Sequence, residues 1–110
     1  MSDYDQQRIK AAERMGWTKI KKNKAFNDLT GVDPSASAHG RRDLLPFFKH
    51  DIAACMDLAE AIECTEIAFS VTLNNLHRAY VKSTRATKAD ADTRPAALFA
   101  ALVEAMEETA

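Results

Sequence analysis

The stretch that most constrains the fold is residues 44–62, LLPFFKHDIAACMDLAEAI, where an apolar segment containing a proline runs directly into a helix. The carboxylate of Asp51 can accept hydrogen bonds from the first free amides of that helix. Beyond Asp51, apolar side chains recur at the spacing of one helical face. They are Ile52, Cys55, Met56, Ala59 and Ile62. We therefore expect a helix over residues 51–63 that packs this stripe on a core.

The length and composition are those of one folded domain. The chain has 110 residues, of which 46% are hydrophobic and 28% charged, values that are ordinary for a globular protein. We therefore expect residues 1–110 to form a single domain. The net charge of −1 conceals a polarity, because residues 1–50 hold ten Lys/Arg and six Asp/Glu, whereas residues 51–110 hold five and ten. Such a chain can present a basic and an acidic surface.

Two further helices are predicted near the ends of the sequence. Over residues 6–15, Ile9 and Ala12 share an apolar stripe, Arg8 lies on or beside the solvent side, and Gly16 is placed to end the helix. Over residues 94–108, a helix starts after Asp92 or Thr93 with a proline in its first turn. Its apolar stripe comprises Leu98, Phe99, Leu102, Val103 and Met106.

Residues 66–73, EIAFSVTL, alternate between apolar and other side chains and predict a strand. Asn74-Asn75 suggests a hairpin that returns over residues 76–83. A two-residue turn would place Arg78 and Lys82 on the apolar face, so we expect a three-residue loop at 74–76 that matches Ala79 to Val71. Residues 84–92 are polar and rich in alanine, which indicates a linker.

The segment between the first two predicted helices contains most of the turn residues. We expect a long loop at about residues 21–43, and residues 17–20 form either a short strand or irregular chain. The order of elements predicts an α+β fold. It consists of a small antiparallel sheet, made by the hairpin at about 66–83 and a short strand at 17–20, packed with helices at about 6–15, 51–63 and 94–108.

Three segments, in this order along the chain, are similar to a known family. They are Met15-Gly16-Trp17 after the first helix, Leu45-Pro46 leading into His50-Asp51-Ile52-Ala53-Ala54, and Ala91-Asp92-Thr93-Arg94-Pro95-Ala96-Ala97 at the start of the last helix. Together they resemble the phage ABA-sandwich domain family, small phage and prophage proteins of mostly unknown function. Residues 74–80 depart from the family in lacking Gly and Trp in the hairpin. The resemblance implies an antiparallel sheet between helices, a viral or prophage origin and action in a bacterial cytoplasm, and it carries over no catalytic residue.

The side chains that could bind a soft metal or act as nucleophiles are few. They are His39, His50, His77, Cys55 and Cys64. None is spaced like the paired ligands of structural zinc, and no phosphate-binding or hydrolase motif occurs. We therefore expect no metal, no cofactor and no enzyme activity. A pairing of Cys55 with His50 would need an exposed thiol, and its apolar neighbours argue against one. The absence of a secretory signal or a long apolar run predicts a cytoplasmic protein with reduced thiols and no membrane span.

The segment 17–26 is the candidate nucleic-acid contact. Four lysines lie between Trp17 and Phe26, a composition typical of a patch that follows a phosphate backbone and stacks bases. Its candidate residues are Lys19, Lys21, Lys22 and Lys24, with Arg41 and Arg42 as an extension. The competing interpretation places both aromatic rings in the core and the lysines in solvent. The net charge of −1 favours that interpretation, since nucleic-acid-binding domains are usually basic.

An acidic surface is the opposite candidate. Its members are Asp57, Glu60, Glu63, Glu104, Glu107 and Glu108. They form either an ordinary solvated face or a surface that imitates nucleic acid and blocks a host protein.

We expect a non-catalytic phage or prophage accessory protein that binds a host protein complex and inhibits a host defence nuclease, an anti-CRISPR-like role. The alternative is a small nucleic-acid-binding accessory protein that uses residues 17–26. An edge strand of the small sheet could also pair with its own copy in a homodimer.

Overall fold

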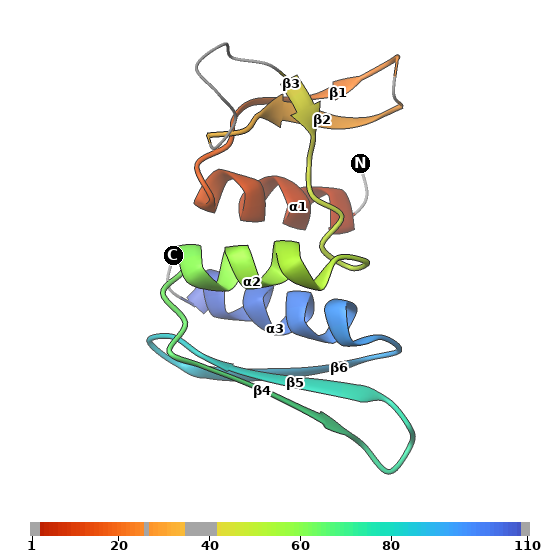
Figure 1. The fold of residues 1–110 in the computed structure, drawn as a ribbon, viewed down its shortest axis with the longest axis vertical. Coiled ribbons are helices and arrows are strands. Elements are labelled where there is room, and N and C mark those ends of the chain that lie inside the picture. Colours follow the sequence, from red (N-terminus) through yellow and green to blue (C-terminus); the bar gives the residue numbers. More distant parts are fainter. Residues whose placement is uncertain (1–2, 26, 35–41, 109–110) are drawn as a thin grey trace. The chain divides into compact units, whose positions relative to one another are not determined.

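A computed structural model describes residues 3–25, 27–34 and 42–108. The described residues form three helices and two three-stranded antiparallel sheets, which confirms the α+β class (Figure 1). The chain divides into two compact units, which we call unit 1 (Met1–Pro46) and unit 2 (Phe47–Ala110).

Unit 1 contains one helix and one sheet. Its elements are α1 (Asp3–Arg14), β1 (Thr18–Asn23), β2 (Asp28–Val32) and β3 (Arg42–Leu44), with β2 in the middle of the sheet. The chain leaves the helix through a turn at residues 15–16, where Gly16 has a φ of 97°, a conformation that favours glycine. The short strand expected at residues 17–20 is present, begins at Thr18 and continues to Asn23.

The loop expected at residues 21–43 is wrong for the described residues, because the end of β1, all of β2 and the first two residues of β3 lie in that range. The turn-forming residues predict one loop, but some of them lie within strands and others between them, as Gly31 in β2 shows. Asn27, with a φ of 50°, lies between β1 and β2, and asparagine tolerates this left-handed conformation. Residues 35–41, and with them part of the expected loop, lie outside the described residues.

The core of unit 1 lies between α1 and the sheet. Its buried cluster comprises Ala12, Trp17, Leu29 and Leu45. Gly31 of β2 permits close approach here, since a Cβ at this position would lie 3.0 Å from Ile20 Cγ1 and 3.2 Å from the Trp17 ring. A side chain at position 31 would therefore push β1 and Trp17 away from β2.

Unit 2 is built in three layers. Its elements are α2 (Ile52–Ala61), β4 (Glu66–Val71), β5 (His77–Lys82), β6 (Ala86–Ala91) and α3 (Arg94–Glu108), with β5 in the middle of the sheet. Helix α3 packs on β5 and β6, and α2 packs on α3 (Figure 1). The Phe48 and Phe99 rings stack at a centroid separation of 4.8 Å, which joins the segment before α2 to the middle of α3.

Helix α2 begins as the sequence predicts. The Asp51 carboxylate accepts hydrogen bonds from the amides of Ala53, at 3.0 Å, and Ala54, at 3.3 Å. The predicted stripe is wrong in part, because Ile52 and Met56 are 37% and 45% exposed. The buried face instead comprises Ala54, Cys55, Leu58, Ala59 and Ile62. The reason is that α2 carries apolar side chains on two neighbouring faces and packs only one of them on α3.

Helix α3 agrees closely with the prediction. All five side chains of its expected apolar stripe are buried, and Thr93 caps its start, where the Thr93 hydroxyl accepts a hydrogen bond from the Ala96 amide at 3.4 Å. Three alanines at positions 97, 101 and 105 are also buried. The helix is therefore covered on more than one side, which its position between α2 and the sheet explains.

The hairpin of β4 and β5 has a three-residue loop at positions 73–75. The Thr72 amide donates to the Leu76 carbonyl at 2.8 Å, and Asn75 adopts a φ of 61° inside the loop. Ala79 lies opposite Phe69, two residues from the expected register. A shift of two residues leaves every side chain on its expected face.

The expected linker at residues 84–92 is wrong, because residues 86–91 form β6 along β5. Alanine, lysine and aspartate have low strand propensity, so the local sequence gives little sign of this strand. Tertiary contacts stabilise it instead. Thr87 is 6% exposed and its hydroxyl donates a 2.8 Å hydrogen bond to the Ala101 carbonyl of α3.

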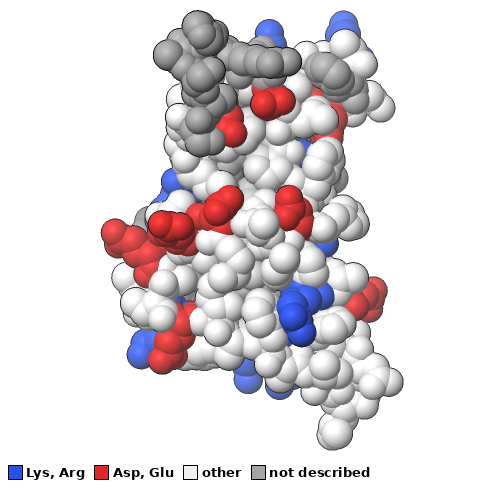
Figure 2. Space-filling view, viewed as in Figure 1, with Lys and Arg blue, Asp and Glu red and all other residues white. Residues whose placement is uncertain are grey.

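The third strand also sets the direction of α3. Because the strands of a meander alternate in direction, three strands after α2 return the chain to the end where α2 began. Helices α2 and α3 are therefore parallel, as Figure 1 shows. Consistent with this, the Cys55 thiol, in the first half of α2, lies 3.6 Å from the Pro95 carbonyl at the start of α3. Acidic side chains gather where the two helices end (Figure 2).

Candidate functional site

The lysines of segment 17–26 are exposed, but Trp17 is not available to stack on bases. Lys19, Lys21, Lys22 and Lys24 are all exposed. Trp17 is 8% exposed and belongs to the core of unit 1. Phe26 and Arg41 lie outside the described residues, and Arg42 begins β3 but its side chain is not among those described. Of the two aromatic residues predicted to stack on bases, only Phe26 therefore stays a candidate.

The described lysines do not share one face of the sheet. Successive residues of a strand point to opposite faces, so Lys21 and Lys22 diverge. Lys22 is paired with Leu29, on the face that packs on α1, and Lys21 is paired with Thr30, on the other face. Lys19, with a φ of 53°, lies where the register shifts between Thr18 and Lys21. This arrangement divides the positive charge between the two faces.

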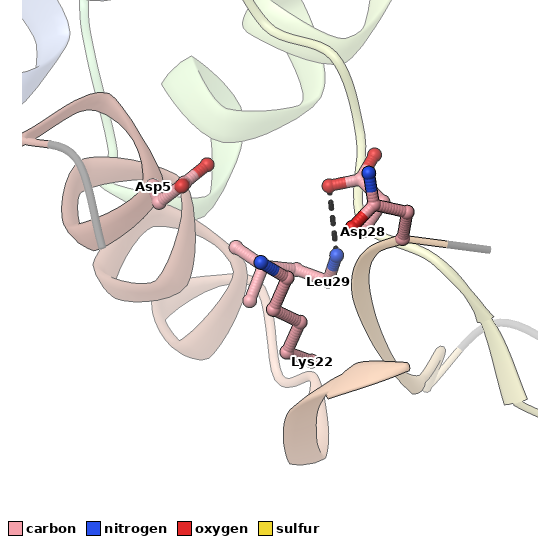
Figure 3. A pocket seen from close by; sticks show the side chains of 5 residues that line it. Asp5, Lys22, Asp28 and Leu29 are labelled. Atoms are coloured by element: carbon pink, nitrogen blue, oxygen red, sulfur yellow. Dashed lines mark hydrogen bonds between the residues drawn. The ribbon is translucent and has the colours of Figure 1, made fainter. Parts of the chain in front are cut away.

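Beside Lys22 is a hollow of about 270 Å³ lined by side chains of both charges (Figure 3). Its lining residues are Asp5, Lys22, Asn27, Asp28 and Leu29. Asp28 is only partly buried, and its Oδ1 accepts a hydrogen bond from the amide of Leu29 at 2.7 Å. The hollow is therefore polar and open, and its carboxylate is already engaged by the backbone.

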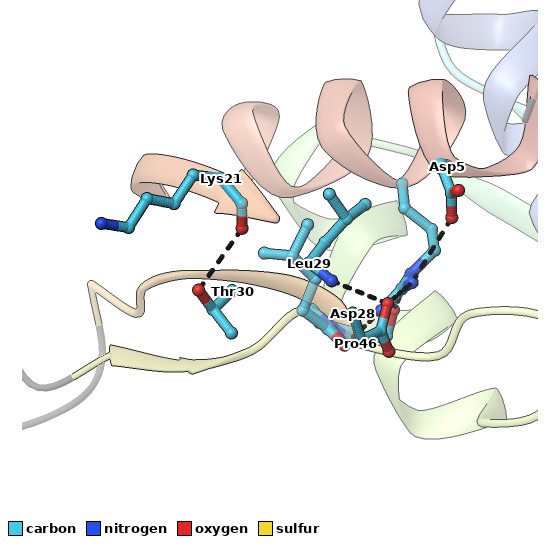
Figure 4. A network of polar contacts seen from close by, with 8 residues as sticks. Asp5, Lys21, Asp28, Leu29, Thr30 and Pro46 are labelled. Atoms are coloured by element: carbon cyan, nitrogen blue, oxygen red, sulfur yellow. Dashed lines mark hydrogen bonds and ion pairs between the residues drawn. The ribbon is translucent and has the colours of Figure 1, made fainter. Parts of the chain in front are cut away.

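Asp28 also pairs with Arg8, which is the hub of a buried polar network (Figure 4). The Arg8 guanidinium donates to Asp28 Oδ1 at 2.9 Å, to the Leu45 carbonyl at 2.9 Å and to the Pro46 carbonyl at 3.1 Å. Arg8 is 2% exposed, so its expected place on or beside the solvent side of α1 is wrong. The segment at 45–46 lies against α1 and supplies the carbonyl acceptors that make this burial tolerable.

The charge of Arg8 affects the ionisation of Asp28. Burial pushes the pKa of Asp28 upward, but the hydrogen bond from Arg8, the bond from the Leu29 amide and the positive charges of Arg8 and Lys22 outweigh it. The pKa of Asp28 is therefore below its ordinary value. The carboxylate is ionised at neutral pH and holds the network together; it is not a proton donor.

The two cysteines differ in exposure. Cys55 is fully buried, and its thiol donates to the Phe48 carbonyl at 3.0 Å. Burial, with a smaller contribution from the charge of Asp51, raises the pKa of Cys55 to about 12. The Cys55 thiol is thus protonated at neutral pH, which removes it as a nucleophile. Cys64 is partly exposed, and burial raises its pKa as well.

Other candidate groups remain apart or lie outside the description. Among the described residues, no three His, Cys, Asp or Glu side chains are grouped as metal ligands would be. His50 is in the turn before α2 and His77 starts β5, while His39 lies outside the described residues. Within the described chain, no helix is both long enough and apolar enough to cross a bilayer.

A charged surface lies where α2 and α3 end. We call Glu60, Glu63, Glu104 and Glu107 the acidic pole; all four are exposed. Neither helix has a basic residue in its last turn, and each helix C-terminus carries a partial negative charge of its own. Because the helices are parallel, these unfavourable charges add at one end of unit 2. Asp57 is exposed earlier on α2, and the Glu108 side chain is outside the description.

The sequence predicts the acidic pole only as a set of carboxylates, without their arrangement in space. Its cause, the parallel direction of α2 and α3, depends on β6, which the sequence did not reveal. The charge division follows the two units, because residues 1–46 hold nine Lys/Arg and six Asp/Glu, whereas residues 47–110 hold six and ten.

No protein-family model, curated protein or solved structure matches the chain. The resemblance to the phage ABA-sandwich family therefore stays a prediction.

Replacing Arg8 by alanine should strongly destabilise unit 1. The change leaves Asp28 and two carbonyls without their buried donor, and breaking a buried pair in this way costs about 3 kcal/mol or more. Trp17, the sole tryptophan and a core residue of unit 1, reports unfolding in urea by its fluorescence. Arg14→Ala, at an exposed position of the same helix, is the matched control and should change the midpoint little. Equal midpoints for the two variants would contradict the role of Arg8.

The depressed pKa of Asp28 predicts an acid dependence. A carboxyl group whose pKa is lower in the folded state stabilises the fold above its unfolded pKa, near 3.8, and loses that contribution as the pH falls through the folded value. Asp28→Asn should therefore be less stable than the natural chain at pH 7, and the difference should shrink towards pH 3. Urea unfolding followed by Trp17 fluorescence at several pH values measures it. A difference that is the same at all pH values would show that Asp28 does not act through its charge.

Cys55 should resist alkylation in the folded protein. Its thiol is buried and protonated, whereas Cys64 is partly exposed. We expect iodoacetamide to modify Cys64 first and Cys55 only after urea is added, as peptide mass mapping can show. Cys64→Ser should leave a native protein that takes up almost no label. Rapid labelling of Cys55 without urea would refute the packing of α2 on α3.

Proposed function

We propose that this chain is a non-catalytic binding protein that docks on a basic surface of a host protein complex through the acidic pole. In this proposal it is a phage or prophage accessory protein that inhibits a host defence nuclease, an anti-CRISPR-like role. The origin rests on the family resemblance, and the mode of binding rests on the acidic pole.

The observation that carries the proposal is an arrangement that costs stability. Carboxylates near a helix C-terminus are unfavourable, by about 0.3–1 kcal/mol each at low ionic strength. Here two parallel helices place such carboxylates at the same end, without a basic residue in either last turn. Local features that oppose the fold are commonly kept for function. A concentrated negative field is what a nucleic-acid-binding groove attracts.

The chemistry of a nuclease groove matches this surface. Such grooves carry lysine and arginine to neutralise phosphates. Exposed glutamates can take the place of phosphates, because both present oxygen acceptors with negative charge. Binding of this kind depends on long-range attraction, so its association rate should fall as salt is added.

The alternative, nucleic-acid binding through residues 17–26, is less well supported. The exposed lysines favour it, but Trp17 is buried and Lys21 and Lys22 point to opposite faces of the sheet. An electrophoretic shift at low salt that is lost when Lys21, Lys22 and Lys24 are reversed in charge would favour this alternative over ours.

Neutralising the acidic pole should abolish docking without unfolding the protein. In the variant, Glu60, Glu63, Glu104 and Glu107 all become Gln. We expect the tagged variant to lose a host complex that the natural chain captures from bacterial lysate at low salt. Its melting temperature should stay the same or rise, because the helix ends lose repulsion.

The matched control neutralises four exposed acids elsewhere, Asp3, Glu13, Asp43 and Asp92, and changes net charge equally. It should capture the complex as the natural chain does. Inhibition of nucleic-acid cleavage by the captured complex then tests the second half of the proposal. Equal capture by the two variants would reject the acidic pole as the docking surface.

A further inference from the structure

Strand β4 is the one edge strand of the described sheets without a feature that blocks further pairing. Edge strands usually carry charges or irregularities, or are very short. Strand β1 carries lysines and a shifted register, β3 has three residues, and β6 carries Lys88 and Asp90. In β4, the five residues after Glu66 are uncharged, contain no proline or glycine, and pair regularly with β5.

The face of β4 that points to the helix side is apolar and incompletely covered. Ile67 and Phe69 lie opposite Val81 and Ala79, both fully buried, so these residues share the face on which α3 packs. Exposure rises along the strand, from 38% at Phe69 to 63% at Val71, and Leu73 in the loop is fully exposed. The guanidinium of Arg94 at the start of α3 lies 5.0 Å from the centre of the Phe69 ring.

The hydrogen bonds of the hairpin fix which backbone groups face outward. Thr72 donates to Leu76, and in an antiparallel pair every second residue is bonded to the same neighbour. Positions 66, 68, 70 and 72 therefore bond towards β5. The N–H and C=O groups of Ile67, Phe69 and Val71 point away from β5, towards the open edge.

We propose that a second copy of this chain pairs along β4, antiparallel, with the two-fold axis at Phe69. Outward-facing residues must meet outward-facing residues, so Ile67, Phe69 and Val71 can pair only among themselves. With the axis at Phe69, Phe69 faces its counterpart and Ile67 faces Val71 of the second copy. In this register each of the three apolar side chains faces an apolar side chain of the second copy. The two three-stranded sheets then form one six-stranded sheet.

The charges of the hairpin favour a second copy in this orientation. Glu66 is the sole charged residue of β4, and residues 67–82 contain no acid; of their two cations, Lys82 and Arg78, Arg78 is already paired with Asp90 of β6 at 2.7 Å. In the proposed register Glu66 lies opposite Thr72 of the second copy, at a hairpin end without acids. The antiparallel arrangement also sends the two acidic poles to opposite ends of the joined sheet. A parallel pairing would instead place like charges side by side.

The small size of the contact sets the expected strength. One strand edge with a few apolar side chains buries less than the roughly 800 Å² per partner of a standard stable interface. The dimer is therefore reversible and depends on protein concentration. It does not rest on the proposed docking function, because β4 and the acidic pole are different surfaces.

Sedimentation velocity over a range of concentrations tests the dimer. The natural chain should shift from monomer to dimer as concentration rises, and Val71→Lys should stay monomeric at the highest concentration. Ala86→Lys adds the same charge at an exposed position of the opposite edge strand and should dimerise like the natural chain. A natural chain that stays monomeric at millimolar concentration, or a Val71→Lys variant that still dimerises, overturns the proposal.

Cross-linking tests the register. In a Cys64→Ser background, Phe69→Cys should form a disulfide-linked dimer under mild oxidation, because facing Cα atoms in a bonded pair lie about 5.5 Å apart. Val71→Cys is the control, since it is more exposed than Phe69 but faces Ile67 of the second copy. Random collisions would favour the more exposed Val71→Cys. Cross-linking of Val71→Cys that equals or exceeds that of Phe69→Cys overturns the two-fold axis at Phe69.

Discussion

The packing of unit 2 depends on α3, which lies between the sheet and α2. Its side chains are buried both against β5 and β6 and against α2, so the helix supplies a large share of the core, and the sheet and α2 pack on it from its two sides. A single helix covers about two strands, because neighbouring strands lie about 4.8 Å apart and a helix with its side chains is about 10 Å wide. The third strand, β4, is therefore left with an apolar face that α3 does not fully cover. The acidic pole has a different origin, since the three strands between α2 and α3 make the two helices parallel and bring their C-terminal carboxylates to one end (Figure 1).

Unit 1 differs from unit 2 in that a buried cation, the guanidinium of Arg8, lies beside its small core. Arg8 donates hydrogen bonds to a carboxylate of β2 and to two carbonyls of the segment that follows β3. These acceptors come from two places in the sequence, Asp28 and the segment 45–46, and Arg8 links both of them to α1. The network adds polar contacts beside the apolar cluster of Ala12, Trp17, Leu29 and Leu45. These hydrogen bonds have a defined geometry, and so they favour one arrangement of α1 and the sheet.

The sequence predicts the elements whose local pattern and tertiary surroundings agree. Helix α3 and strand β4 have clean periodicities of 3.6 and 2, and both occur within a residue or two of the expected bounds. The buried face of α2 could not be chosen, because Ile52 and Met56 extend its apolar stripe into solvent. Strand β6 could not be foreseen from Ala, Lys and Asp, because its stability comes from pairing with β5. The burial of Arg8 depends on carbonyls 37 and 38 residues away, which no local pattern encodes.

The same limit applies to the candidate site. Each glutamate of the acidic pole is visible in the sequence, but their convergence follows from an odd number of strands between two helices. With the expected two-stranded hairpin, α3 would be antiparallel to α2, and the carboxylates at the ends of the two helices would lie apart. Whether β6 is present therefore decides where the negative charge of unit 2 is concentrated.

The composition of residues 67–73 has a consequence beyond the native fold. These seven residues, IAFSVTL, contain no charge, proline or glycine, which is the sequence signature of segments that stack into cross-β fibrils. In the native protein, β5 occupies one side of this segment. When heat or denaturant frees it, identical segments from many molecules can assemble without limit. The chain's resistance to irreversible aggregation is thus set by how seldom β4 leaves β5.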